Sequence, residues 1–323
     1  MSRSALRISP RTRIALPVIA LGISAALLCA AAIGGCRSAE HKSAHAQTES
    51  AESAEAPAPR IERDLVYSAA RSGQAPLLLD LYHPPESAES AESIASSFFG
   101  TASQPAVVLI HGGSWQRGNR ERMARNAEAI ARAGFVVANI EYSLAPDYQF
   151  PAPLEDCRTA VRWLRQNASN YDIDAERIGA FGFSAGGHLA LLLATTDGEA
   201  GAADSSAIQA VVAGAPPVDL YAFPENSAMR RLLGVRRKEA PELYRKASPI
   251  NHISANDPPT FLYHGRYDWL VPVAQSRRMA AGLEAAGVTV KLLETKQGHQ
   301  PAAPDNAEGL GRAIAFLKEH LGD

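Results

Sequence analysis

The 323-residue sequence predicts an α/β fold in which a mostly parallel sheet of eight strands is covered by helices on both faces. Short runs rich in β-branched residues alternate with amphipathic stretches of helical period from Ile61 onward. Several of these short runs are apolar throughout, as expected for strands that are buried on both faces. The two observations together indicate parallel strands joined by crossover helices.

Each strand is assigned to a run of apolar and β-branched residues. The strands are expected at residues 61–67, 77–82, 106–110, 135–142, 178–182, 210–214, 260–263 and 288–294. The helices are expected at 120–133, 153–167, 185–195, 273–286 and 304–321. No helical pattern separates the first two strands, so we expect them to pair antiparallel at one edge of the sheet.

The first 36 residues are interpreted as an export signal. Four arginines before residue 14 are followed by an uncharged stretch and then by small residues. The string Ile-Gly-Gly-Cys at 33–36 resembles the bacterial lipobox, in which cleavage leaves a cysteine that carries lipid. We therefore expect lipid attachment at Cys36 of an exported lipoprotein on the periplasmic side of the envelope. Arg37 resembles the outer-membrane pattern. The alternatives are an uncleaved signal anchor, since the stretch is long enough to cross a bilayer, or a secreted protein.

Two segments of low complexity bound the folded part. Residues 37–59 are rich in Ala, Ser, Glu and His, and contain too little apolar surface to offset chain entropy, which predicts a flexible tether. Residues 86–104 begin with the same composition and are expected to form a surface insertion. The folded domain is therefore expected to span residues 60–323.

Charge and cysteine content exclude two classes of protein. Without the four arginines of the signal, 28 basic residues of the 32 remain against 34 acidic ones, and phosphate binding needs concentrated Lys and Arg. We therefore expect no nucleic-acid partner. Removal of the signal discards Cys29 and leaves Cys36 lipidated, so Cys157 remains as a core thiol in a helical pattern, without a structural disulfide.

Ser184 is the predicted nucleophile. It stands in the string Gly-Phe-Ser-Ala-Gly-Gly at 182–187, between an apolar strand pattern and a buried helix pattern. This context is the one that a nucleophile elbow requires, because the sharp turn leaves no space for a Cβ at the flanking glycines. The start of the helix also favours developing negative charge near the serine. A tight turn without catalysis is the alternative interpretation.

The loop after the strand at 106–110 is the predicted oxyanion hole. The string His-Gly-Gly-Ser-Trp follows this strand directly, and adjacent glycines allow the backbone to turn its N–H groups inward. Donors fixed at that point lower the barrier to a tetrahedral intermediate. The predicted donors are the N–H groups of Gly112, Gly113, Ser114 and Ala185. His111 is expected to brace the loop, and an ordinary glycine-rich turn is the alternative.

His299 is the predicted general base, because a serine hydroxyl is hardly ionised at neutral pH. It follows the last strand and a glycine that permits a turn. His188 lies one helical turn after the nucleophile and His264 ends a strand, so both are expected to be structural.

Asp268 is the predicted orienting acid. It follows the strand at 260–263 and precedes a helix, where it can fix the histidine tautomer and stabilise the imidazolium. The order Ser, Asp, His along the chain is also the one found in proteins whose nucleophile elbow follows a strand of an α/β sheet. Asp219, which follows the preceding strand, is the rival acid.

The motifs in this order resemble those of secreted bacterial carboxylesterases of the α/β-hydrolase superfamily, near the hormone-sensitive-lipase-like, acetylxylan esterase and feruloyl esterase groups. The motifs are residues 111–115, Tyr-Ser-Leu-Ala-Pro at 142–146, Phe-Pro-Ala-Pro at 150–153 with Asp156, residues 182–188, residues 265–272 and Gly298-His299. The resemblance covers about residues 61–321. It implies the α/β-hydrolase fold and hydrolysis of a carboxylic ester through an acyl-enzyme, with no metal and no organic cofactor.

One departure bears on the substrate. Relatives of hormone-sensitive lipase carry an acid directly before the nucleophile, but this sequence has Phe183 there. Many acetylxylan-esterase-like sequences also have phenylalanine at this position. This favours small-acyl or carbohydrate-linked esters as substrates. The Ser-Trp pair at 114–115 resembles kynurenine formamidases, so an amide is the second substrate class. A catalytically silent binding module of the same fold is the non-enzymatic alternative, and the oligomeric state is left open.

The segment from about 219 to 253 is expected to form a small cap beside the cleft. Its basic residues between 230 and 238 are interpreted as a solvated helix face rather than a site for an acidic substrate. Trp115 and Trp269 flank the predicted oxyanion and acid loops. Both are candidates for an acyl or sugar pocket, with core or shielding roles as the alternative.

Overall fold

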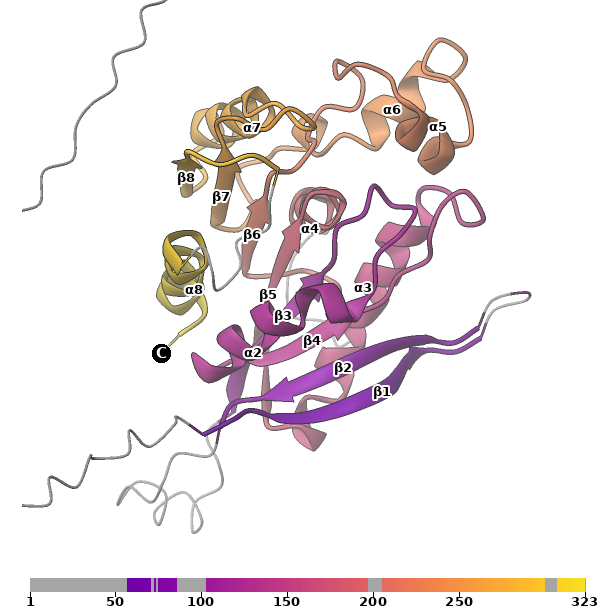
Figure 1. The fold of residues 1–323 in the computed structure, drawn as a ribbon. Coiled ribbons are helices and arrows are strands. Elements are labelled where there is room, and N and C mark those ends of the chain that lie inside the picture. Colours follow the sequence, from indigo (N-terminus) through magenta and orange to yellow (C-terminus); the bar gives the residue numbers. More distant parts are fainter. Residues whose placement is uncertain are drawn as a thin grey trace, which may run out of the picture. The chain divides into compact units, whose positions relative to one another are not determined.

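The described residues of the computed structural model form one eight-stranded sheet with helices on both sides (Figure 1). The structure describes residues 57–70, 73, 75–85, 103–196, 205–299 and 307–322. The strands are β1 (Arg60–Ser68), β2 (Leu77–His83), β3 (Gln104–Ile110), β4 (Val136–Ile140), β5 (Ile173–Phe183), β6 (Ala210–Gly214), β7 (Thr260–Gly265) and β8 (Val290–Thr295). The helices are α2 (Ala124–Arg132), α3 (Ala152–Gln166), α4 (Ala185–Thr196), α5 (Ser227–Leu233), α6 (Pro241–Lys246), α7 (Ala274–Ala285) and α8 (Ala307–Leu321). Short 3₁₀ turns are η1 (Arg120–Met123), η2 (Ala168–Asn170) and η3 (Pro249–Asn251).

The strand order β1-β2-β4-β3-β5-β6-β7-β8 confirms the predicted mostly parallel sheet. As predicted, β1 and β2 pair antiparallel at one edge, and β2 also runs antiparallel to β4. All later pairs are parallel. In the register of the central strands Ile110 lies opposite both Ile140 and Gly182, so the carboxyl ends of β3, β4 and β5 are level at one rim of the sheet.

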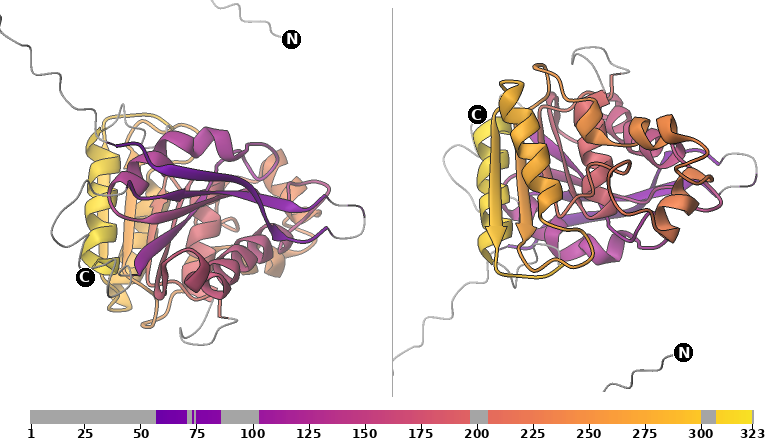
Figure 2. Two further views of the ribbon diagram at one scale, coloured as in Figure 1. Left: turned by 90° about the horizontal axis from the view of Figure 1, so that it is seen from below. Right: turned by 90° about the horizontal axis from the view of Figure 1, so that it is seen from above.

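Two apolar clusters fill the space between the sheet and its helices. On one face, side chains of α3, α4 and α7, such as Leu154, Leu189 and Met279, pack against the sheet. On the other face, α2 and α8 contribute Ile130 and Phe316 (Figure 2). Strands covered in this way are buried on both sides, which is why β3, β4 and β6 are apolar along almost their whole length.

The predicted elements differ from the observed ones mainly at their ends. β5 begins at Ile173, five residues before the expected position, and the helix expected at 120–133 is divided into η1 and α2. The segment 219–253 contains α5, α6 and η3, which were not predicted individually. These helices are too short for a helical period to register in the sequence, although Asn226 caps α5 and Gly234, with a φ of 73°, ends it.

Several sequence predictions fall outside the described residues. The export signal with Cys36, residues 37–56 of the tether and residues 86–102 of the insertion are among them. The predicted upper boundary of the insertion is wrong, because Gln104 already belongs to β3. Within the described ranges, no helix has the length and hydropathy needed to span a bilayer.

Candidate functional site

The predicted site residues lie on four loops at the carboxyl-terminal rim of the parallel strands. Ser184 follows β5, the glycine loop follows β3, Asp268 follows β7 and His299 follows β8. Side chains from residues more than 180 positions apart are brought together because parallel strands end at the same rim of a sheet.

Ser184 occupies a sharp turn between β5 and α4. Its φ of 55° lies in the left-handed region, and its N–H donates to Gly214 O at 2.7 Å. The turn needs glycine on both sides, because a Cβ at Gly182 would lie 2.2 Å from Gly186 O, and a Cβ at Gly186 would lie 2.1 Å from Ile110 O. Crossing backbones therefore force the serine into this conformation, which is a strained one for a residue with a side chain.

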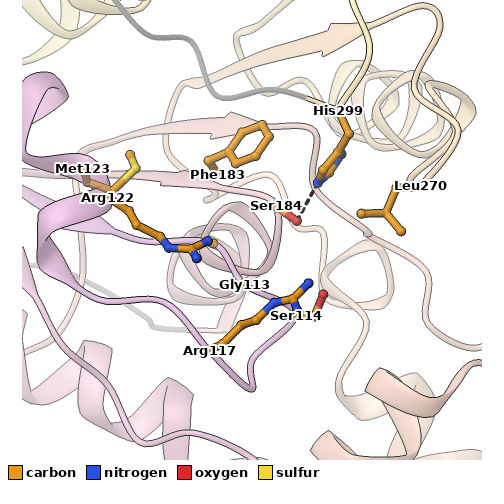
Figure 3. A pocket seen from close by; sticks show the side chains of 10 residues that line it. Gly113, Ser114, Arg117, Arg122, Met123, Phe183, Ser184, Leu270 and His299 are labelled. Carbon is orange, nitrogen blue, oxygen red and sulfur yellow. Dashed lines mark hydrogen bonds between the residues drawn. The ribbon is translucent and has the colours of Figure 1, made fainter.

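Ser184, His299 and Asp268 form a continuous hydrogen-bonded series. His299 Nε2 lies 2.9 Å from Ser184 Oγ (Figure 3). His299 Nδ1 lies 2.6 Å from Asp268 Oδ2. The Phe183 ring packs against the imidazole with 5.0 Å between ring centroids. A carboxylate that holds Nδ1–H leaves Nε2 free to accept the serine proton, so this arrangement is suited to making an alkoxide nucleophile.

Groups other than His299 also hold the Asp268 carboxylate in place. Its Oδ1 accepts the N–H groups of Leu270 at 2.9 Å and Val271 at 2.8 Å. Burial raises the pKa of Asp268, but hydrogen bonds from His264, His299 and the Val271 N–H outweigh burial and hold this pKa well below its usual value. The acid is therefore ionised throughout the neutral and mildly acidic range.

His264 contacts this acid, which the sequence interpretation did not anticipate. Its Nε2 lies 2.7 Å from Val271 O and 3.2 Å from Asp268 Oδ2, and its Nδ1 lies 2.7 Å from Ser276 Oγ. The ring is fully buried. The predicted structural role for this histidine is thus extended, since it fixes the loop that carries the acid. The strand-end position was visible in the sequence, but its partner was not.

The glycine loop lies against the nucleophile as the sequence predicts. A Cβ at Gly112 would meet Phe183 O at 2.9 Å and Ser184 Cβ at 3.3 Å. Gly113 has a φ of 132° and Ser114 a φ of 56°, so the chain turns sharply here. Together with Ser184 and His299 these three loop residues line a cavity of about 270 Å³. Ala185, the fourth predicted donor, lines an adjoining cavity of about 250 Å³.

Two buried histidines support the loop rather than face the nucleophile. His111 Nδ1–H donates to Gly112 O at 2.8 Å, and its ring stacks on Tyr142 with 4.4 Å between centroids. His188 accepts the indole N–H of Trp115 at 3.2 Å and donates to Ala247 O at 2.7 Å. Burial lowers the pKa of both histidines to about 4. These contacts agree with the predicted bracing role of His111 and structural role of His188.

The remaining sequence candidates take other places. Asp219, the rival acid, pairs with Arg278 at 2.6 Å and accepts the N–H of Ala222, so it does not contact His299. The Cys157 thiol is fully buried in the apolar core, as predicted. Trp269 is 84% exposed, which contradicts the core role considered for it, and it lines neither of the two cavities beside Ser184.

The adjoining 250 Å³ cavity is predominantly apolar. Trp115, Pro217 and Val271 line it together with residues of the 219–253 segment, including Phe223 and Met229. Ser114, Ser184 and Leu270 line both cavities, so the nucleophile lies where the two meet. Among the described residues, no group of three or more His, Cys, Asp or Glu side chains is arranged to hold a metal ion.

Comparison with known proteins finds one matching family and several esterases that this chain resembles. The family described as BD-FAE matches residues 95–283, more than half of the chain. Esterase LipQ of Mycobacterium tuberculosis (strain ATCC 25618 / H37Rv) is 31% identical over 235 residues, which cover 69% of this chain and 53% of LipQ. The chain spans about half the length of the curated relatives that it matches first.

Solved structures of esterases are similar to this chain over a larger share of its length. A truncated carbohydrate esterase from gut microbiota superposes with a TM-score of 0.70 at 25% identity, covering 82% of this chain and 98% of that one. Thermogutta terrifontis esterase 2 phosphorylated by paraoxon superposes with a TM-score of 0.64 at 26% identity, covering 82% and 95%. These similarities confirm the α/β-hydrolase fold.

Proposed function

Because the chain belongs to the BD-FAE family, we propose that it is a carboxylic ester hydrolase with a catalytic triad of Ser184, His299 and Asp268. The observation that carries this proposal is the series of two hydrogen bonds, of 2.9 Å and 2.6 Å, that joins the hydroxyl to the carboxylate through the imidazole. Each contact has the length required for proton transfer or for orientation of the base.

In the proposed acylation step, Ser184 Oγ attacks the ester carbonyl while His299 Nε2 takes the hydroxyl proton. The charge of the tetrahedral intermediate develops on the former carbonyl oxygen. Backbone N–H groups of Gly112, Gly113, Ser114 and Ala185 are the proposed donors to that oxygen, and such donors lower the barrier most when they are fixed before the reaction. The imidazolium then gives its proton to the leaving alcohol as the ester bond breaks.

In the proposed deacylation step, water occupies the place of the alcohol and His299 takes its proton. The hydroxide attacks the acyl-enzyme, and the proton returns to Ser184 Oγ as the free acid leaves. Asp268 is the positioning group in both steps. It keeps the Nδ1–H tautomer and stabilises the imidazolium through the 2.6 Å contact.

The proposed substrates are small-acyl or carbohydrate-linked esters. The size of the 250 Å³ cavity supports a short acyl chain, and its lining by Trp115, Phe223 and Met229 supports an apolar one. The structural similarity to a carbohydrate esterase supports a sugar-linked alcohol. Rates with 4-nitrophenyl acetate, acetylated xylan, feruloyl esters and formyl-kynurenine separate these esters from the amide alternative.

The central test of the proposal is replacement of the nucleophile. Ser184→Ala is expected to lower kcat for 4-nitrophenyl acetate about 10⁶-fold, by analogy with other serine triads. A fluorophosphonate probe is expected to label the native chain at Ser184 and to leave the variant unlabelled. Circular dichroism and the thermal midpoint show whether the variant is folded. Near-native turnover in a folded Ser184→Ala protein would refute the proposed mechanism, and a chain without turnover or label would be a binding module.

A further inference from the structure

Two arginine side chains line the same 270 Å³ cavity as Ser184 and His299. Arg117 belongs to the loop after β3, and Arg122 belongs to η1. Figure 3 shows both side chains extending toward the space beside Ser184. Among the described residues that line this cavity there is no Asp or Glu, so two positive charges face the nucleophile without a lining carboxylate.

Neither guanidinium group has a hydrogen bond or an ion pair within the described ranges of the chain. Nearby arginines are paired: Arg120 contacts the carboxylates of Asp64, Asp80 and Glu141. In the basic segment at 230–238, Arg230 pairs with Glu225 and Arg231 donates to Gln116 Oε1. The two guanidinium groups beside the nucleophile therefore have unused donors, which points to an anionic group on the substrate.

The position of His299 indicates which half of an ester enters this cavity. The imidazole must reach the leaving oxygen to protonate it, and His299 lines the cavity that contains Arg117 and Arg122. It is not among the described residues that line the apolar cavity with Trp115 and Met229. The alcohol half therefore fits the side of the arginines, and the acyl half fits the apolar side.

We infer that the preferred substrates are esters with a small apolar acyl group and a leaving alcohol that bears a carboxylate, bound by Arg117 and Arg122. This inference rests on the proposed esterase function. Two guanidinium groups offer planar forks of N–H donors that match the two oxygens of a carboxylate. The carboxylate takes no part in bond breaking, so its contacts lower KM rather than raise kcat.

The test compares two acetate esters of nearly equal shape. In 4-acetoxybenzoate the leaving alcohol carries a carboxylate, and in methyl 4-acetoxybenzoate this group is neutral. The full chain is expected to hydrolyse the anionic ester with a kcat/KM about tenfold above that for the neutral one, the size of one charge-assisted hydrogen bond. Arg117→Gln and Arg122→Gln are each expected to lower kcat/KM about tenfold more for the anionic ester than for the neutral one, mainly through KM.

Arg132→Gln is the matched control. It removes the same charge from α2, where Arg132 pairs with Glu128 at 3.4 Å, and Arg132 does not line the cavity. Both esters are expected to keep their native rates in this variant. Equal loss of the anionic ester in Arg132→Gln would show that net charge, not the cavity, sets the preference, and would overturn the inference.

The remaining outcomes separate the inference from the function on which it rests. Equal kcat/KM for both esters, in native chain and variants alike, would overturn the inference and leave the esterase intact. Failure to hydrolyse either ester would overturn the proposed function itself. Mono-4-nitrophenyl succinate, whose acyl half is anionic, tests the orientation: a tenfold loss with this ester in the arginine variants, without a loss for 4-acetoxybenzoate, would overturn the placement of the carboxylate on the alcohol.

Discussion

Asp268 shows how much support a single side chain receives. Two backbone N–H groups hold Oδ1, and the rings of His299 and His264 approach Oδ2. A buried carboxylate without such donors would have a raised pKa, yet the pKa of this one is lowered. The hydrogen bonds thus keep the acid charged as well as in place. An ionised acceptor is what an imidazole needs if it is to become positively charged during turnover.

Asp268→Asn is expected to reduce kcat about 10⁴-fold with little change in fold, because an amide nitrogen beside Nδ1 favours the wrong tautomer of His299. Steady-state rates with 4-nitrophenyl acetate measure this effect. Asp219→Asn is the control, since its remaining amide oxygen can still accept the Ala222 N–H, and Asp219 lies away from the histidine. A kcat for Asp268→Asn within tenfold of the native value would contradict the assigned role.

At the scale of elements, the site depends on close crossings between loops of neighbouring strands. Gly186, at the start of α4, packs against the backbone at the end of β3, and Gly182 packs against the backbone of Gly186. η1 is joined to the β1–β2 edge through the buried Arg120, whose guanidinium contacts Asp64 and Asp80. The nucleophile turn and the glycine loop are thus packed against each other, through backbone approaches that leave no room for an additional atom.

Gly186→Ala is expected to lower the free energy of unfolding by about 1–3 kcal/mol, because the new Cβ would lie 2.1 Å from Ile110 O. The measurement is urea denaturation together with esterase activity, which should fall as the turn shifts. Gly311→Ala on α8 is the matched control: its Cβ would meet nothing within 4 Å, so the same change should raise stability by up to about 1 kcal/mol. Equal stability of the two variants would refute the steric argument.

For the molecule as a whole, His111 and His188 couple stability to pH. Burial lowers the pKa of both from 6.5 to about 4. Between these values the unfolded chain binds protons that the folded chain does not bind. The contribution of these two histidines to the free energy of unfolding is therefore fully present above about pH 6.5. It falls as the pH drops toward 4, by up to about 3 kcal/mol for each histidine.

His188→Gln is expected to flatten this dependence, since it removes one of the buried histidines whose pKa is lowered. Urea midpoints between pH 7 and 4.5 measure the slope, with His252→Gln as the control because the His252 ring is partly exposed and donates to the backbone carbonyl of Lys246. An unchanged slope in a folded His188→Gln protein would argue against this coupling.

The predicted lipid anchor at Cys36 also belongs to this scale. Cys36→Ser is expected to move the exported protein from the membrane fraction to the soluble fraction, because no lipid can then be attached. Immunoblots of fractionated cells and the mass of the N-terminal peptide measure the change. A variant that stays in the membrane would favour the uncleaved signal anchor, and a native chain in the soluble fraction would favour secretion.

The sequence by itself determined the strands, most of the helices and the local setting of the nucleophile. Hydrophobic period is a property of neighbouring residues, so it identifies β3 and α4 without reference to the rest of the chain. The glycines at 182 and 186 predict a turn, and this signal too lies in neighbouring residues. The helices α6 and α5, of six and seven residues, could not be predicted from the sequence, because so short a segment has no measurable hydrophobic period.

Only the tertiary structure decided which distant side chains meet. Asp219 and Asp268 both follow strands in sequence, but the order β6-β7-β8 brings Asp268 beside His299 and leaves Asp219 with Arg278. The contact of His264 with the acid, the exposure of Trp269 and the two arginines beside the nucleophile were likewise invisible along the chain. Contacts of this kind depend on how the sheet orders its strands, and strand order arises from packing across the whole fold rather than from local sequence.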